Sequence, residues 1–312
     1  MTSAPLITLF TSPKPFNNPH INVIQRNAIH SWVELGDQVA VVLLGEEEGL
    51  AEAARDLNVL HLPQVERNVK GTPLISSLFR EARGVNQSPL LAYVNTDIIL
   101  FPDFVAGAST LLKQAREFLM VGQRWDMQIT KLLDFSAGWQ ESLRADCRAA
   151  GRLHKPMGSD YFVFPRSCFE QIPDFAIGRA GWDNWMIYEA RQRGWQTVDA
   201  TADVMIIHQD HDYSHLPGGQ PHYRLPETGE NVRLAGGKRH IFLLRDANLV
   251  LQDGKIARKP LTWKSFWREV EIFPLVKLHS EFLGRLHFAI LHPRKAYEEW
   301  RKAQKEQPAF QE

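Results

Sequence analysis

Short apolar runs alternate with stretches of helical periodicity over the first 215 residues of the chain. The runs have the length and residue types of buried strands, whereas the stretches between them repeat apolar residues every three or four positions. We predict strands at residues 5–10, 38–44, 59–62, 90–94, 118–122, 160–165, 197–198 and 204–207. This alternation predicts an α/β, Rossmann-type fold whose mixed, mainly parallel sheet is covered by helices on both faces.

Helices are predicted between these strands, and two of them have clear start signals. Gly71-Thr72-Pro73 predicts a helix with Thr72 as its cap and Pro73 in its first turn, and Asp103 caps a later one. Further helices are predicted at residues 21–32, 48–57, 138–151 and 181–193. Right-handed crossovers then bring the loops after the parallel strands to one edge of the sheet.

Beyond residue 215 the alternation ends. Gly and Pro become frequent from 216 to 238, and apolar runs at 240–244 and 249–256 predict a hairpin that turns near Asp253-Gly254. The final segment interleaves aromatic residues and Leu with charged residues, which indicates amphipathic helices. We therefore divide the chain into a domain of residues 1–240 and a C-terminal hairpin and helical extension of residues 241–312.

The C-terminal extension carries an excess of positive charge. Between residues 255 and 306 there are twelve Lys or Arg and six acidic residues, a net charge of +6. A basic amphipathic tail can lie on an anionic membrane surface as a peripheral contact. Alternatively, these helices pack on the domain or on a partner and leave a solvated basic face.

The composition of the whole chain indicates a soluble globular protein. Of its 312 residues 44% are hydrophobic, and 36 Lys or Arg balance 36 Asp or Glu, which argues against nucleic-acid binding. Cys147 and Cys168 are too few for a disulfide scaffold and lack the paired spacing of a zinc site. No apolar run approaches the roughly 18 residues of a membrane span. We expect a cytoplasmic protein, with the inner face of the membrane as its only peripheral contact.

Polar side chains stand where two of the predicted strands end. Asn95, Thr96 and Asp97 follow the fourth strand, and His208 follows the last one. In open α/β sheets, ligands bind outside the carboxyl ends of the strands. A carboxylate suits Mg²⁺ or Mn²⁺, and an imidazole shifts the preference toward Mn²⁺. We predict that Asp97 and His208 hold one divalent cation; the alternative is a strand-ending turn and a histidine bonded to backbone.

A second arrangement of metal ligands follows the same strand. His208, Asp210, His211, Asp212 and His215 lie within eight positions and can form a metal site of their own. Their spacing does not match the helix-borne HExxH motif. A His/Asp metallohydrolase is therefore kept as an alternative function.

The order and separation of these motifs resemble those of a GT-A fold glycosyltransferase of the family 2-like kind, within a bacterial glycosyltransferase-like group. The resemblance covers about residues 5 to 215 and rests on an α/β N-terminal half and three motifs. These are the DXD-like Asn95-Thr96-Asp97, the segment 181–185 with the sequence Gly-Trp-Asp-Asn-Trp, and the strand that ends in His208. The resemblance implies a GT-A-like sheet that binds a nucleotide diphosphate sugar along its edge.

The resemblance also implies which residues bind the donor. Similar proteins hold the base and ribose just past the first strand, where Thr11, Ser12 and Lys14 lie. Asp97 and His208, at the ends of two other strands, would hold the Mn²⁺ or Mg²⁺ that bridges the two phosphates. The implied nucleotide-sugar-binding residues are Thr11, Ser12, Lys14, Arg26, Asn95, Thr96, Asp97, Arg124 and Asp126. Alternatively, Lys14 is a solvated loop charge, and Arg124 and Asp126 form a structural ion pair.

Asp183 is the implied catalytic base. It occupies the place of the acidic residue that follows a Gly-Trp pair in similar enzymes, and an inverting transfer needs a carboxylate beside the attacking hydroxyl. The implied acceptor-binding residues are Asp160, Trp182, Asn184 and Trp185. The alternatives are a helix cap for Asp183, a turn role for Asp160 and buried packing for the two Trp side chains.

The resemblance therefore implies a glycosyltransferase of glycan biosynthesis. It would move a hexosyl or related sugar from a nucleotide diphosphate sugar to a hydroxyl acceptor, which is a glycan, a lipid-linked molecule or a protein, with the help of a divalent metal. Asn95 replaces the first acid of the DXD pattern. A non-catalytic nucleotide-sugar-binding or glycan-binding relative is therefore the alternative.

Overall fold

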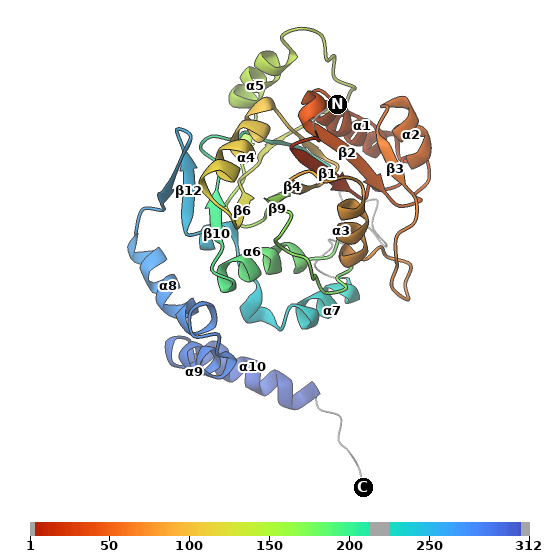
Figure 1. Cartoon of the computed structure of the whole chain (residues 1–312). Helices are drawn as coiled ribbons and strands as arrows, with labels where there is room; N and C mark the ends of the chain where they lie inside the picture. Colours follow the sequence, from red (N-terminus) through yellow and green to blue (C-terminus); the bar gives the residue numbers. More distant parts are fainter. Residues whose placement is uncertain (1–3, 212–224, 307–312) are drawn as a thin grey trace. The chain divides into compact units, whose positions relative to one another are not determined.

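A computed structural model describes residues 4–211 and 225–306 of the chain. The chain divides into two compact units (Figure 1). Unit 1 comprises residues 1–190 and 195–259, and unit 2 comprises residues 191–194 and 260–312. We expected the boundary at residue 240. The compact unit runs on to residue 259 because the chain from 249 to 258 adds two strands to the large sheet.

A nine-stranded sheet forms the centre of unit 1, in the order β13-β12-β10-β6-β9-β4-β1-β2-β3. Its strands are β1 (Ile7–Thr11), β2 (Val39–Leu44), β3 (Leu60–Leu62), β4 (Leu90–Val94), β6 (Phe118–Val121), β9 (Tyr161–Pro165), β10 (Gln196–Asp199), β12 (Leu249–Gln252) and β13 (Lys255–Arg258). Strand β9 runs antiparallel between β4 and β6, and β13 runs antiparallel to β12. The other pairs are parallel, so the predicted α/β class with a mixed, mainly parallel sheet is confirmed.

Helices cover both faces of this sheet (Figure 1). The strands alternate their side chains between the faces: Leu90, Ala92 and Val94 of β4 enter one core, whereas Tyr93 faces the other. The first core contains side chains of α1 (Pro19–Val33), α2 (Leu50–Asp56) and α4 (Pro102–Gln114). On the opposite face, aromatic rings of α3 (Ile75–Gly84) and α6 (Trp182–Gln192) pack against rings of the sheet. The remaining helices of unit 1 are α5 (Trp139–Ala150) and α7 (Pro226–Leu234).

A second, four-stranded sheet lies in the order β5-β11-β7-β8. Its strands are very short: β5 (Ile98–Ile99), β7 (Trp125–Met127), β8 (Arg152–Leu153) and β11 (Ile207–Gln209). The register sets His208 opposite Ile98 on one side and Asp126 on the other. This sheet therefore brings the residues that follow β4 next to those of β7 and β11.

Several local predictions are wrong. Asp103 does not cap α4, because Phe101 is the N-cap residue, Pro102 begins the helix and Asp103 lies in its first turn. Helix α3 begins at Ile75 rather than at Thr72, because the backbone around Pro73 and Leu74 forms bridges with Arg67 and Ala176 instead. Residues 240–244 form no strand. They lie in two short 3₁₀ segments, Lys238–His240 and Leu244–Asp246, and in the three residues that connect them. The hairpin itself turns at Asp253-Gly254 as predicted, but β12 and β13 are its two arms.

Unit 2 consists of three helices, α8 (Trp263–Val276), α9 (Glu281–Leu291) and α10 (Pro293–Glu306), with the short segment 191–194. Thr262 caps α8 by accepting a hydrogen bond from the Ser265 N–H. Helices α8 and α9 pack closely, because a Cβ on Gly284 would lie only 2.5 Å from the Leu275 side chain. Within residues 4–211 and 225–306, no helix is both long enough and apolar enough to cross a membrane.

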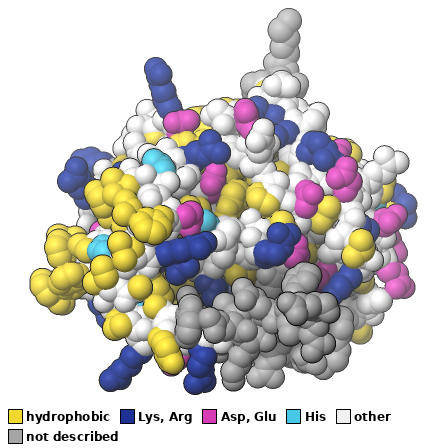
Figure 2. Space-filling model, turned by 90° about the horizontal axis from the view of Figure 1, so that it is seen from below, with side chains coloured by type: hydrophobic (Ala, Val, Ile, Leu, Met, Phe, Trp, Pro, Cys, Tyr) yellow, Lys and Arg dark blue, Asp and Glu magenta, His cyan; other side chains and the backbone are white. Residues whose placement is uncertain are grey.

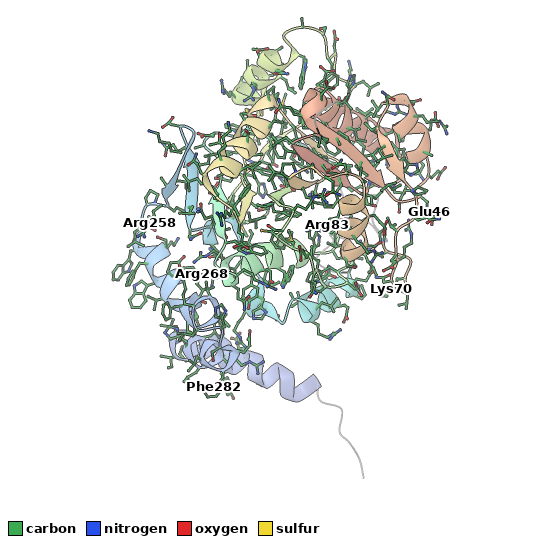
Figure 3. All side chains as sticks on the ribbon, in the orientation of Figure 1. Glu46, Lys70, Arg83, Arg258, Arg268 and Phe282 are labelled. Carbon is green, nitrogen blue, oxygen red and sulfur yellow. The ribbon has the colours of Figure 1, made fainter. Side chains whose placement is uncertain are left out.

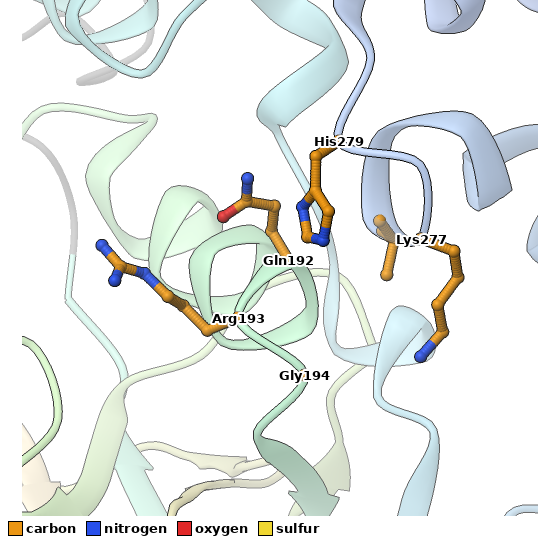
Figure 4. Close-up of a pocket in the computed structure, with 6 residues that line it drawn as sticks. Gln192, Arg193, Gly194, Lys277 and His279 are labelled. Atoms are coloured by element: carbon orange, nitrogen blue, oxygen red, sulfur yellow. The ribbon is translucent and has the colours of Figure 1, made fainter.

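A cavity in unit 2 is lined by Gln192, Arg193, Gly194, Val276, Lys277 and His279 (Figure 4). None of the predicted metal, donor or acceptor residues lines it. The chemistry of the site must therefore be sought at the strand ends of unit 1.

Candidate functional site

Asp97, His208 and His211 come together at the edge of unit 1 where β4 ends. One potential ligand atom from each lies within 4.8 Å of the other two. Asp97 Oδ2 is 3.0 Å from His211 Nε2 and 4.0 Å from His208 Nε2. The predicted pair of ligands, Asp97 and His208, is thus joined by a third, which had been assigned to the alternative metallohydrolase cluster. Of the other members of that cluster, Asp212 and His215 lie outside the described residues.

Hydrogen bonds from β11 and α1 fix the backbone that carries Asp97. The Gln209 N–H donates to the Asp97 carbonyl oxygen at 3.0 Å. The buried Gln209 amide donates to the Ile24 carbonyl oxygen at 2.7 Å and accepts from Asn27 Nδ2 at 3.0 Å. Buried polar groups of this kind are costly to leave unpaired, so the network holds Asp97 and His208 in register.

Cationic groups surround the Asp97 carboxylate. Burial alone would favour its neutral form, but the hydrogen bond from His211 and the charges of Lys14, His208 and His211 hold the pKa of Asp97 well below its usual range. Lys14 Nζ lies 3.6 Å from Asp97 Oδ2 and 3.2 Å from His211 Nε2. Burial lowers the pKa of Lys14, and the Asp97 charge opposes that shift. Asp97 is therefore ionised at neutral pH.

The donor set fits a divalent cation. Asp97 Oδ1 is buried and has no hydrogen-bond partner among the described residues, so one carboxylate oxygen is available as a ligand. One carboxylate and two imidazoles favour Mn²⁺ over Mg²⁺, because Mg²⁺ prefers oxygen ligands.

Asp126 lies beside His208, near the ring nitrogen that faces away from Asp97. His208 Nδ1 lies 3.4 Å from Asp126 Oδ1 and 3.5 Å from Asp210 Oδ1. Burial would lower the pKa of His208, but these two carboxylates and the Asp97 charge raise it to about 9. Nδ1 has no hydrogen-bond partner among the described residues, so the two carboxylates act on the ring as nearby charges, and Nε2 is the nitrogen on the Asp97 side. The second cluster of possible ligands, Asp126, His208 and Asp210, shares this imidazole.

Arg124 joins Asp126 to Asp160. Arg124 Nε donates to Asp126 Oδ1 at 2.9 Å, and Nη1 donates to Asp160 Oδ1 at 2.7 Å. Asn95 Nδ2 also donates to Asp160 Oδ1, at 3.0 Å. The structure thus connects Asn95, beside Asp97, to the start of β9, because β9 runs antiparallel to β4 with Tyr161 opposite Val94.

Asp183 lies in the first turn of α6, where its Oδ1 accepts a hydrogen bond from the Gly181 N–H at 3.2 Å. Burial is the main cause that raises its pKa to about 6, and the Asp160 charge adds to it, although backbone N–H groups act in the opposite direction. Asp183 also lies near the buried Tyr93 hydroxyl, whose pKa rises through burial and through the charges of Asp97, Asp183 and Asp160. Tyr93 therefore lies within electrostatic reach of all three carboxylates.

The first two strands of the sheet contribute polar groups to the same edge. Thr11 ends β1 and is buried beside Tyr93, and Ser12 follows it. Gly45 follows β2 with a φ of +114°, and a Cβ there would lie 3.3 Å from Ser12 Oγ and 2.3 Å from Glu47 Oε2. Glu47 Oε2 is buried and has no hydrogen-bond partner among the residues that the structure describes.

Sequence reasoning missed Glu47 as a site residue. Arg67 Nη2 donates to its other carboxylate oxygen at 2.8 Å. Glu47 lies just past β2, a strand parallel to β1. The rule that ligands bind outside the carboxyl ends of strands led to Asp97, and it could have identified Glu47 as well.

Several predicted residues make contacts of other kinds. The Arg26 guanidinium lies 2.8 Å from the carboxylate of Asp56, the last residue of α2, and so pairs with a helix rather than with the strand ends. Trp182 packs on Tyr93 and Phe162, and Trp185 packs on Phe175.

The remaining two predicted residues are also held by the fold. Asn184 Nδ2 donates to the Phe242 carbonyl oxygen at 2.7 Å. Thr96 is buried. The binding roles of these residues stay predictions.

Two solved structures similar to this chain are those of glycosyltransferases, the kind of protein that the sequence motifs resemble. A mannosyltransferase from Pyrobaculum calidifontis in complex with GDP-Man and Mn²⁺ matches with a TM-score of 0.44 and 15% identity over 69% of this chain. Glucosyl-3-phosphoglycerate synthase from Mycobacterium tuberculosis, in complex with Mn²⁺, UDP and glucosyl-3-phosphoglycerate, matches with a TM-score of 0.47 and 13% identity.

The extent of these matches differs. This chain spans 59% of the length of the mannosyltransferase, whereas the match to the synthase covers 83% of this chain and 88% of the synthase. No family model and no curated protein matches the chain. Because both TM-scores lie below 0.5, the function has to be argued from the residues of the site.

Proposed function

We propose that this chain is a GT-A fold glycosyltransferase that moves a sugar from a nucleoside diphosphate sugar to a hydroxyl acceptor. The observation that carries the proposal is the convergence of Asp97, His208 and His211 beside Lys14 at the carboxyl ends of parallel strands. A divalent cation held by the first three residues would neutralise the diphosphate as it leaves, which is the main electrostatic demand of glycosyl transfer.

The chain's own groups complete the donor site. Lys14 adds a positive charge next to the metal ligands, where it can contact a phosphate oxygen. Glu47 and Ser12 flank Gly45 at the ends of β1 and β2, and the free carboxylate oxygen of Glu47 can accept hydrogen bonds from ribose hydroxyls. A ligand without hydroxyl groups would leave this buried carboxylate oxygen without a hydrogen-bond partner, which is costly. Glu47 would therefore favour nucleoside diphosphates over simple phosphates.

Asp160 and Arg124 would hold the sugar of the donor. The two side chains are bonded to each other at 2.7 Å, so each is fixed in orientation before substrate arrives. Asp160 is also close enough to Asp183 to affect its ionisation. The donor sugar therefore lies between the metal ligands and Asp183 in this proposal.

Asp183 would act as the general base. Its carboxylate takes the proton of the acceptor hydroxyl while the acceptor oxygen bonds to the anomeric carbon, and the electron pair of the broken carbon–oxygen bond remains on the diphosphate. A pKa raised to about 6 keeps Asp183 mostly ionised at neutral pH yet basic enough to accept a proton.

The proposed compartment of the protein is the cytoplasm. Two free, buried cysteines and the intracellular origin of nucleotide sugars support it.

The direct test is release of nucleoside diphosphate from a panel of uridine and guanosine diphosphate sugars. In the presence of Mn²⁺ one donor should be hydrolysed slowly, with water in place of the acceptor. Chelation should stop the reaction, and added Mn²⁺ should restore it. Tight binding of a donor without turnover across the panel would favour the non-catalytic binding protein, and a failure to bind any nucleotide would contradict both.

A further inference from the structure

We propose that an exposed apolar face of α8 and α9 in unit 2 binds the surface of a bilayer that contains anionic lipids. The side chains of this face are between 40% and 75% exposed, although all are large and apolar. The apolar face consists of Trp263, Phe266, Trp267, Phe273, Phe282, Leu286 and Ile290. The inference goes beyond the proposed glycosyl transfer and does not depend on it.

Aromatic rings gather at the start of α8. Trp263, Phe266 and Trp267 follow the i, i+3, i+4 spacing of one helix face, and their ring centroids lie 5.6 to 6.0 Å apart. A different stripe of the same helix, Ile272, Leu275 and Val276, is buried. Helix α8 therefore carries more apolar surface than the packing of unit 2 covers.

Helix α9 repeats this arrangement. Phe282, Leu286 and Ile290 recur every four residues on one face and are exposed, and Figure 3 shows Phe282 projecting away from the ribbon. Large apolar patches are rare on the surface of monomeric proteins and mark a surface that binds something apolar. Figure 2 shows hydrophobic side chains gathered at one edge of the molecule, with Lys and Arg side chains beside them.

Positive charge accompanies the apolar face. Residues 260–306 contain nine Lys or Arg and six acidic residues. Two of the acids are neutralised inside unit 2: Glu269 binds Arg191 at 2.7 Å, and Glu271 binds Arg268 at 3.2 Å. Exposed Lys264, Lys277 and Arg285 stand next to the exposed apolar residues in sequence.

An apolar groove runs between the two helices. It encloses about 520 Å³ and is lined by Phe266, Val270, Phe273 and Val276, with Glu269, Lys277 and His287 as its polar residues. A groove of this size accepts part of an acyl chain while Lys277 remains near the phosphate of the headgroup.

The combination favours a bilayer over a protein partner. The cores of protein interfaces are depleted of Lys, whereas interfacial helices combine Trp, Phe and Leu on one side with Lys and Arg beside them. Trp also prefers the boundary between hydrocarbon and headgroups. The exposed cations supply charge complementarity to anionic headgroups.

The test is co-sedimentation of the full chain with vesicles of phosphatidylcholine, alone or mixed with phosphatidylglycerol. The wild type should bind the mixed vesicles, and binding should weaken with salt. The double variant Trp263→Ser with Trp267→Ser should bind about tenfold more weakly. Lys264→Glu with Lys277→Glu should lose about tenfold on mixed vesicles and little on neutral ones.

Matched variants of unit 1 serve as controls. Leu132→Ser removes an apolar side chain that is 63% exposed, and Lys113→Glu reverses an exposed charge, so neither should alter vesicle binding. Unchanged circular dichroism would show that the variants fold. Equal binding of wild type and both double variants would overturn the proposal, as would absence of vesicle binding. A wild-type dimer that dissociates in Trp263→Ser would assign the face to a second copy instead.

Discussion

The charges of Asp97 and Asp183 both raise the pKa of the Tyr93 hydroxyl. The surroundings of the two carboxylates nevertheless shift their own pKa values in opposite directions. Lys14, His208 and His211 surround Asp97 and keep its pKa below the usual range. At Asp183 the pKa rises to about 6, because burial and the Asp160 charge outweigh the backbone N–H groups that favour its ionised form. One carboxylate is thus suited to remain anionic and hold a cation, whereas the other is suited to exchange a proton near neutral pH.

The largest effect should come from Asp97→Asn. Loss of the only carboxylate among the three ligands should abolish tight Mn²⁺ binding and lower nucleoside diphosphate release by about 10³-fold or more. Metal binding measured by calorimetry and turnover measured on the same preparation check this. Asp103→Asn, which removes a carboxylate on α4, is the control. Full Mn²⁺ affinity in the Asp97 variant would contradict the assignment of the metal site.

Asp183→Asn should separate catalysis from binding. Without a base, turnover should fall by about 10²-fold or more, while the donor KM and the Mn²⁺ affinity stay the same. Steady-state kinetics at saturating metal measure this split. A rise in KM with unchanged kcat would instead give Asp183 a binding role.

Asp126→Asn tests the orientation of His208. Mn²⁺ affinity should fall about 10- to 100-fold if the Asp126 carboxylate, 3.4 Å from His208 Nδ1, orients the ring, because the variant removes its charge. Arg152→Ala is a matched control: it removes an exposed partner of Asp126, 3.2 Å away, and leaves the contact with His208 in place. Equal metal affinity in the wild type and Asp126→Asn would show that His208 is positioned by other contacts.

The pH profile should follow Asp183. The base must be deprotonated, so kcat at saturating Mn²⁺ should be level at neutral pH and fall about tenfold per pH unit below the pKa of about 6. Asp183→Asn should have no such limb. A wild-type midpoint near pH 4 would mean that Asp183 is not the titrating base.

The smallest effect concerns stability. The folded state raises the pKa of Asp183 from the usual value for Asp, about 4, to about 6, so the wild type loses stability as pH rises through that range. Asp183→Asn carries no charge and should be more stable by about 1 kcal/mol at pH 8, because the side chain is only partly buried. The gain should vanish at pH 4. Thermal unfolding at the two pH values measures it, and a gain at pH 4 alone would contradict the sign.

The strand predicted at residues 204–207 is β11 (Ile207–Gln209) in the structure, so His208 lies inside a strand rather than after one. The sequence was sufficient to predict the α/β class and the strand end that precedes Asp97. Both predictions rest on local patterns, because a buried run followed by polar residues is visible in a few positions. The same rule applied to β2 would have found Glu47.

Other features depend on contacts between distant parts of the chain. The second sheet consists of strands of two or three residues, which are too short to have a periodic signal, yet its register brings His208 to Asp126. The Arg124–Asp160 bond depends on the antiparallel insertion of β9, which no local pattern specifies. Trp182 lies in a cluster of rings from β4 and β9, and sequence alone could not distinguish that position from a sugar-binding surface.

The insertion of β9 also constrains the order in which the sheet can be completed during synthesis. Strands β4 and β6 leave the ribosome before β9, which lies between them in the sheet and pairs with both. The position between them is filled only after Pro165, the last residue of β9, has been synthesised. Until then, a nascent chain has two open strand edges facing each other across an unfilled position. Such edges are sites of mispairing and aggregation. A chain that stops before β9 would therefore be expected to need a chaperone, although it contains most of the parallel strands.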